Sequence, residues 1–301
     1  MLIGGDIAML TNIYVIDYVL KDLDASKDQL DRIFGTEPLW IHPDMTPGQA
    51  ITAMYYQLPG NGEMMHALGM FQEGGDSIRV DHDRLFLIGI MCDDMDRTMA
   101  EISARGLTFV HAEPQRYAVG ESNSLGTLHG VEIFIARHIA GGDKIAREMM
   151  FTKDGSSDFG DETQDGLFTG VYGLDFAVSD MDAALDTFRA VFGTEPINTT
   201  PRTAEAGVVS YHFQAPGNGK GLSEVGFFAL DHGAPKDGLA GRIAAFLNRH
   251  GEGIFRMDLL VTDLDAMRAA LASRGITLPA GDQPILPDIH GTDLRYVTDS
   301  Q

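Results

Sequence analysis

VYGLDFAVSDMDAALDTFRAVFGTEP, at residues 171–196, is the stretch of sequence that decides the fold. It begins with a short apolar run that is typical of a buried strand. Asp180 then suits a helix N-cap, because its side chain can accept hydrogen bonds from free N–H groups of the first turn. Gly193 suits the left-handed residue that ends a helix. Between them, apolar residues recur at helical spacing, which predicts an amphipathic helix. These residues are Met181, Ala184, Leu185, Phe188, Val191 and Phe192.

Parts of this stretch recur earlier in the chain. FGTEP occurs at 34–38 and at 192–196, and PGNG occurs at 59–62 and at 216–219, with offsets of 158 and 157 residues. Two such matches at nearly the same offset indicate that the 301 residues form two similar halves.

A shorter repeat lies inside each half. The triplet Asp-(Leu/Met)-Asp occurs at 22–24, 94–96, 180–182 and 263–265. A glycine follows the first Asp of each triplet after 12 or 13 residues, namely Gly35, Gly106, Gly193 and Gly275. Apolar strand-like segments precede each triplet and follow each glycine. The repeating unit is therefore predicted to be a strand, a helix and about three further strands.

The repeat also predicts the domain organisation. Residues 1–140 and 168–301 are each expected to form a domain of two units. Residues 141–167 are acidic, rich in Gly and Ser and poor in apolar residues, which is typical of a linker. The expected fold class is α+β, with four βαβββ modules that pair into two cup-shaped domains.

Composition limits the class of partner and the compartment. The chain has 22 Lys and Arg against 44 Asp and Glu, a formal charge of −22, which argues against nucleic acid and anionic membranes as partners. Cys92 is the only cysteine, which excludes internal disulfides and cysteine-based metal sites. The sequence has no long apolar run and no basic start like that of a signal peptide, so a cytoplasmic protein is expected. A homodimer remains one candidate oligomeric state.

The four repeated units resemble the vicinal oxygen chelate superfamily, which includes glyoxalase I, bleomycin-resistance proteins, methylmalonyl-CoA epimerase and type I extradiol dioxygenases. The resemblance extends over about 12–138 and 168–301 and is specific for fold rather than for reaction. It implies that two units pair and that their sheets form a cup, which normally holds a divalent metal ion. Four units in two domains resemble the extradiol dioxygenases most.

The resemblance also implies where metal ligands would stand. One is usually a His on the first strand of a unit, seven residues before the Asp that opens the helix. The corresponding residues are Val15, Leu87, Gly173 and Arg256. The other is usually a Glu on the last strand, where this chain has Phe134 and Arg295 in the even units and residues near Gly69 and Gly226 in the odd units. These residues offer no imidazole or carboxylate, so we expect no metal and no other cofactor.

Because strands alternate faces, these positions also predict what else lines each cup. The first cup is expected to receive Val15, Asp17, Leu87, Gly89, Glu132 and Phe134, and the second Gly173, Asp175, Arg256, Asp258, Asp293 and Arg295. The opposite face should pack on the helices with Ile16, Tyr18, Ile88, Ile90, Ile133 and Ile135 in the first half and Leu174, Phe176, Met257, Leu259, Leu294 and Tyr296 in the second.

Each cup leaves two interpretations open. In the second, Arg256 and Arg295 either clamp an anionic ligand or pair with Asp175, Asp258 and Asp293 as internal staples. In the first, a flat organic molecule binds with Asp17 or Glu132 as base and Phe134 beside it, or side chains fill the cup.

His129 and His290 recur in the turn before the last strand of each half. They are candidates for acid–base groups at the cup rim, or else they cap the turn. The leading functional hypothesis is a protein that binds or converts a small organic molecule without a metal, by isomerase- or lyase-type proton transfer if it is an enzyme. A metal-dependent extradiol dioxygenase or glyoxalase and a non-catalytic drug-binding resistance protein are the alternatives.

Overall fold

The computed structural model describes residues 10–35, 38, 40–42, 52–57, 67–72, 82–117, 120–138, 167–198, 202–205, 207–216, 222–231, 233–235 and 237–298. The predicted linker at 141–167 lies outside the described residues except for Leu167. The PGNG segments lie outside them except for Pro216.

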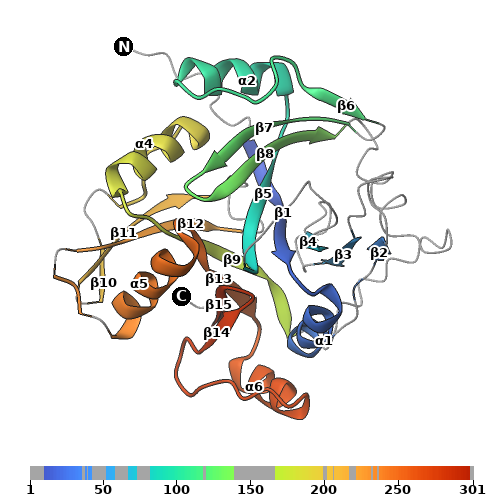
Figure 1. The fold of residues 1–301 in the computed structure, drawn as a ribbon, viewed down its shortest axis with the longest axis vertical. Helices are drawn as coiled ribbons and strands as arrows, with labels where there is room; N and C mark the ends of the chain where they lie inside the picture. The colour runs from blue at the N-terminus through green and yellow to red at the C-terminus, as the bar shows by residue number, and fades with distance from the viewer. Residues whose placement is uncertain are drawn as a thin grey trace.

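Two mixed sheets and five helices make up the described fold (Figure 1). The first half contains β1 (Leu10–Leu20), α1 (Leu23–Phe34), β2 (Trp40–His42), β3 (Thr52–Gln57), β4 (Ala67–Gln72), β5 (Arg84–Cys92), α2 (Met95–Ala104), β6 (Gln115–Tyr117), β7 (Gly120–Leu128) and β8 (Val131–His138). The second half contains β9 (Phe168–Ala177), α4 (Met181–Phe192), β10 (Arg202–Glu205), β11 (Val208–Gln214), β12 (Glu224–Leu230), α5 (Gly238–His250), β13 (Gly253–Val261), α6 (Leu264–Ser273), β14 (Ile285–Ile289) and β15 (Thr292–Thr298).

Each sheet contains two of the repeated units. The eight-stranded sheet has the order β2-β3-β4-β1-β5-β8-β7-β6, and the seven-stranded sheet has the order β10-β11-β12-β9-β13-β15-β14. The first strands of the two units, β1 with β5 and β9 with β13, pair antiparallel at the centre of each sheet. The last strand of each unit lies parallel to its first strand. The predicted α+β fold is confirmed.

The predicted aspartate N-caps are confirmed in all four units. A side-chain oxygen of the opening aspartate accepts a backbone N–H of the first turn in α1, α2, α4 and α6, from Asp22, Asp94, Asp180 and Asp263. Gly35 and Gly193 end α1 and α4 with φ of 70° and 72°, a conformation that strains residues with a Cβ atom.

The predicted helix-facing side of both sheets forms the core. All twelve residues assigned to that face are at most 3% exposed. In the second half, the Phe188 ring of α4 lies 5.2 Å from the Phe176 ring and 4.5 Å from the Phe227 ring. Cys92 is buried in the same core, and burial raises its thiol pKa to about 11.

α5 is the helix that the repeat did not predict. The offset between the halves grows from 157 residues at PGNG to 169 residues between Asp94 and Asp263, so the second half carries an insertion here. The inserted helix packs Leu239, Ala240 and Ile243 in a cluster with Phe228 and Phe255. It therefore covers part of the sheet face opposite to α4 and α6.

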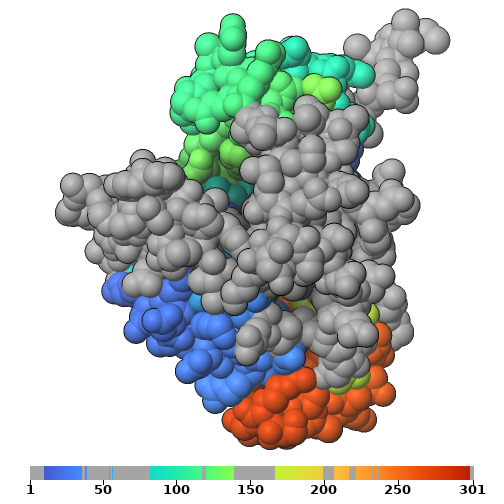
Figure 2. All heavy atoms as spheres, turned by 90° about the vertical axis from the view of Figure 1, so that its right-hand side faces the viewer, coloured from blue at the N-terminus to red at the C-terminus, as the bar shows by residue number. Residues whose placement is uncertain are grey.

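The two halves share one core. Buried residues of both halves belong to a single apolar cluster, and the rings of Phe34 in α1 and Phe168 in β9 lie 5.7 Å apart. Figure 2 shows residues of the first half, in blue, directly against orange residues of the second half. No helix among the described residues is long and apolar enough to cross a membrane.

Candidate functional site: two matched cup faces

Strand register places the predicted site residues of each half in two rows. In the first half, Asp17 on β1 is opposite Leu87 on β5, and Leu87 is opposite Glu132 on β8. The next row contains Val15, Gly89 and Phe134.

The second half repeats both rows with different chemistry. Asp175 on β9 is opposite Arg256 on β13, and Arg256 is opposite Asp293 on β15. The next row contains Gly173, Asp258 and Arg295. Arg256 therefore takes the place of Leu87 between two acidic residues, and Asp258 and Arg295 take the places of Gly89 and Phe134.

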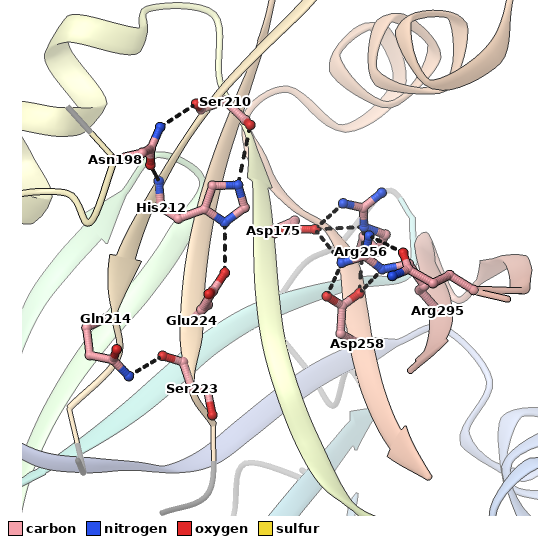
Figure 3. A network of polar contacts seen from close by, with 11 residues as sticks. Asp175, Asn198, Ser210, His212, Gln214, Ser223, Glu224, Arg256, Asp258 and Arg295 are labelled. Carbon is pink, nitrogen blue, oxygen red and sulfur yellow. Dashed lines mark hydrogen bonds and ion pairs between the residues drawn. The ribbon is translucent and has the colours of Figure 1, made fainter. Parts of the chain in front are cut away.

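Four residues of the second cup form one ion cluster (Figure 3). Arg256 donates from Nε to Asp175 Oδ2 at 2.7 Å, and its Nη2 lies 2.5 Å from the same oxygen. Arg295 binds both oxygens of Asp258, with Nε 2.7 Å from Oδ1. The two ion pairs are joined, because Arg256 Nε also lies 3.7 Å from Asp258 Oδ1. We call Asp175, Arg256, Asp258 and Arg295 the ion cluster.

Burial separates most of this cluster from solvent. The side chains of Asp175, Arg256 and Asp258 are 5%, 5% and 4% exposed, whereas Arg295 is 21% exposed. Burial and the neighbouring Asp175 carboxylate raise the pKa of Asp258 in spite of both arginines. The Arg256 guanidinium also stands over the Phe228 and Phe255 rings, at 5.1 and 5.3 Å from their centroids. The positive charge of Arg256 therefore interacts with side chains of the protein itself.

Asp293 lies outside this cluster. Its carboxylate accepts the backbone N–H of Asp288 at 3.1 Å, and it lies 3.4 Å from Nε of Arg242 in α5. Burial raises its pKa, although Arg242 and Arg256 act in the opposite direction.

The two rows of the first cup contain two carboxylates, Asp17 and Glu132, among four residues without a polar side chain. Asp17 is 6% exposed. Glu132 is half-buried and accepts a hydrogen bond from Ser124 Oγ at 2.8 Å, and Ser124 Oγ in turn accepts the Gly126 N–H at 2.8 Å. Neither row of this cup contains an arginine. Phe134 is half-buried beside them.

His129 and His290 both contact the opposite half of the chain. His129 Nδ1 lies 2.7 Å from Glu252 Oε2, and its Nε2 lies 3.2 Å from Thr187 Oγ1 in α4. His290 Nδ1 lies 3.0 Å from Asp83 Oδ2 in the other half. Each histidine therefore bridges the two halves, because the turn that carries it packs against the opposite half.

The structure also brings together polar groups of β11 and β12 that the sequence analysis did not single out. His212 Nδ1 lies 3.2 Å from Glu224 Oε2, and its Nε2 lies 3.3 Å from Ser210 Oγ (Figure 3). This arrangement has the order of a Ser–His–Glu triad, but Ser210 is only 1% exposed, so a substrate does not reach its hydroxyl. Ser210 and His212 alternate along β11, which was the available signal for a shared face.

No group of three or more His, Cys, Asp and Glu residues in the described part of the chain is arranged to hold a metal ion. At the positions where the superfamily resemblance places ligands, the side chains are apolar in the first half and include Arg256 and Arg295 in the second.

Comparison with solved structures identifies the fold. A triple mutant of 4-hydroxymandelate synthase from Streptomyces coelicolor matches with a TM-score of 0.75 and 12% identity, over 96% of this chain and 93% of that chain. The Mn(II)-bound glyoxalase from Novosphingobium aromaticivorans matches with a TM-score of 0.61 and 13% identity, over 98% and 84%. The 2,2',3-trihydroxybiphenyl 1,2-dioxygenase from Sphingomonas wittichii matches with a TM-score of 0.57 and 12% identity, over 97% and 91%.

The chain thus has the glyoxalase and extradiol dioxygenase fold of the vicinal oxygen chelate superfamily, as its repeat predicts. No protein-family model and no curated protein sequence matches it. At 12–13% identity the likeness concerns the fold alone.

Proposed function

We propose that the first cup binds a small organic molecule with a carbonyl or aromatic group, and that Asp17 and Glu132 transfer protons on it. One observation carries this proposal. The same row of the sheet reads Asp17, Leu87, Glu132 in the first half and Asp175, Arg256, Asp293 in the second. An arginine neutralises the aspartate of the second cup, whereas the equivalent residue of the first cup is a leucine.

The residues at the superfamily's ligand positions do not fit a divalent metal. Val15, Leu87 and Phe134 have no donor atom, and the guanidinium groups of Arg256 and Arg295 repel a cation. The nearest carboxylates of the second cup, Asp175 and Asp258, are already bound by these arginines. The proposed chemistry therefore relies on protein side chains, without a metal as Lewis acid.

Strand spacing gives the reaction its geometry. Asp17 and Glu132 are two strands apart, so their Cα atoms are roughly 10 Å from each other. A flat molecule on Leu87 then has a carboxylate at each side. One carboxylate accepts a proton from a C–H bond next to a carbonyl, and a carboxylic acid returns a proton to a neighbouring carbon or oxygen. The net change is an isomerisation, which needs no oxidant.

Ser124 suits the role of positioning Glu132. Its hydroxyl donates to Oε1 and is itself fixed by the Gly126 N–H, so the orientation of the carboxylate is held by the bulged end of β7. Among the described residues no hydrogen bond holds the other oxygen, Oε2, which is the one we expect to contact a ligand.

The net charge of −22 favours one competing use of the same cup, the sequestration of a cationic drug without turnover. A thermal-shift screen with small aryl ketones and aryl cations distinguishes these uses. A probe that binds in the first cup should raise Tm in the wild type and lose that effect in Glu132→Gln, but keep it in Asp293→Asn, the equivalent substitution in the second half.

Turnover is then tested by NMR in D₂O. Deuterium should enter the C–H position next to the carbonyl of a bound ketone in the wild type, and exchange should fall at least tenfold in Glu132→Gln. Binding of cations alone, with no exchange of any bound ketone, would favour sequestration. Ligand-induced stabilisation that is lost in Asp293→Asn and kept in Glu132→Gln would contradict the assignment to the first cup.

A further inference from the structure

A cavity of about 190 Å³ lies between α5 and the turn that joins β14 to β15. Arg242, Phe246 and Arg249 line it from the helix, Phe255 from β13, Asp288 from β14 and Asp293 from β15. It borders a wider groove of about 630 Å³ between the halves, with which it shares Arg249, His250, Asp288 and Gly291. Because α5 is an insertion of the second half, the repeat provides no equivalent cavity in the first.

Two arginines of α5 face this cavity, and each forms only a long ion pair with a carboxylate. Arg242 and Arg249 are two helical turns apart and therefore lie on one face of α5. The Arg242 side chain is 42% exposed and its Nε is 3.4 Å from Asp293 Oδ2, while Arg249 is 64% exposed and its Nη1 is 3.2 Å from Asp288 Oδ2. Tight guanidinium–carboxylate bonds are usually about 2.7–2.9 Å. Both arginines thus remain open to an external anion, unlike the buried Arg256.

An apolar wall lies beside these charges. The rings of Phe246 and Phe255 have centroids 6.2 Å apart, and His250 stacks on Phe246 at 4.8 Å. Burial, His82 and Arg249 lower the pKa of His250 to about 4, so this imidazole is neutral at pH 7. The wall suits a flat ring, whose faces and edges gain contact with the two phenylalanines.

The charge count of the cavity selects the ligand. With all four groups ionised, Arg242 and Arg249 balance Asp288 and Asp293. Burial raises the pKa of Asp293, against the opposite effect of Arg242 and Arg256, so less free energy is needed to protonate this carboxylate when an anion binds. When Asp293 binds a proton, the cavity has one positive charge in excess, which matches one carboxylate.

We propose that this cavity binds a small aromatic monocarboxylate, with its ring against Phe246 and Phe255 and its carboxylate on Arg242 and Arg249. The site is independent of the first cup, because none of its residues lies there.

Calorimetric titration with benzoate at pH 6.5 tests this site, with benzamide and benzylamine as the neutral and cationic analogues. Benzoate should bind more tightly than either analogue. Arg242→Gln should weaken benzoate binding at least tenfold, and Arg249→Gln by a smaller factor. The matched control is Arg189→Gln on α4, a 37% exposed arginine that is also ion-paired and does not line this cavity. It should leave benzoate affinity unchanged.

Proton uptake provides a second readout. Titrations in buffers of different ionisation enthalpy should show that benzoate binding takes up protons in the wild type and takes up none in Asp293→Asn. The proposal is overturned if benzoate does not bind at millimolar concentration, if benzylamine binds more tightly, or if Arg242→Gln and Arg189→Gln behave alike.

Discussion

Leu87 and Arg256 occupy the same place in the two halves of the chain. Each lies opposite an aspartate on the first strand of its sheet and an acidic residue on the last strand. The leucine leaves the first row with two carboxylates and no cation, whereas the arginine joins Asp175 of the second row to Asp258 in the buried ion cluster. One fold, used twice, therefore has a leucine between two acidic residues in one half and an arginine there in the other.

Arg295→Met should destabilise the protein by roughly 3–5 kcal/mol, because removing one partner leaves the buried Asp258 carboxylate without its main ion pair. Urea unfolding at pH 7 measures the change. The double variant Arg295→Met/Asp258→Asn should be less destabilised than the single variant, since it removes the stranded charge. A stabilised Arg295→Met protein would instead indicate that Arg295 serves to bind an anionic ligand.

Phe188→Ala should cost roughly 3–5 kcal/mol of unfolding free energy, because this ring is fully buried between α4 and the sheet. Val110→Ala is the control at an exposed apolar position, with 59% of the residue accessible, and should change stability by less than about 0.5 kcal/mol. A loss below about 1 kcal/mol for Phe188→Ala would place the helix in a different register from the one described.

Acidification should weaken the fold through His250. Burial, His82 and Arg249 lower its pKa from the ordinary 6.5 to about 4, so the unfolded chain binds a proton at a higher pH than the folded one. The stability that depends on a neutral His250 is therefore present above pH 6.5 and decreases as the pH falls towards 4. Urea midpoints between pH 4.5 and 7 should fall less steeply in His250→Gln than in the wild type.

His111→Gln, a substitution at an exposed position of the first half, is the control for that series. Its pH dependence should match the wild type. Equal slopes in His250→Gln and the wild type would show that other groups govern the loss of stability in acid.

The junction between the halves should depend on His129. Its imidazole joins Glu252 to Thr187, and hydrogen bonds from Ser179 with the nearby imidazole keep the pKa of Glu252 below its usual value even though burial raises it. His129→Ala should cost about 1–3 kcal/mol by leaving a partly buried carboxylate less well satisfied. Differential scanning calorimetry should also show whether the halves still unfold together, as their shared core predicts.

Local signals made most of this fold predictable from the sequence. Asp180 and Gly193 define a helix through caps that involve only neighbouring residues, and the alternation of Asp175 with Phe176 assigns strand faces by a period of two. The ion cluster could be anticipated in the same way. The repeat aligns the strands of the two halves, and the period of two then places the charged residues on one face.

Long-range packing accounts for what the sequence did not predict. His129 meets Glu252 across 123 residues, and no local pattern indicates which half the turn will contact. α5 was missed because it has no counterpart in the first half and because Asp237 makes no side-chain cap bond at its start. Arg242 was therefore not recognised as a group that faces Asp293.

Metal analysis of the purified protein tests the central claim most directly. The protein is incubated with Mn(II), Fe(II), Ni(II) or Zn(II), freed of unbound metal and measured by mass spectrometry. Val15, Leu87, Phe134, Arg256 and Arg295 at the ligand positions predict well under one equivalent of each metal, and any ketone exchange activity should survive a chelator. One tightly bound equivalent that is lost in Asp17→Asn or Glu132→Gln would contradict a metal-independent first cup.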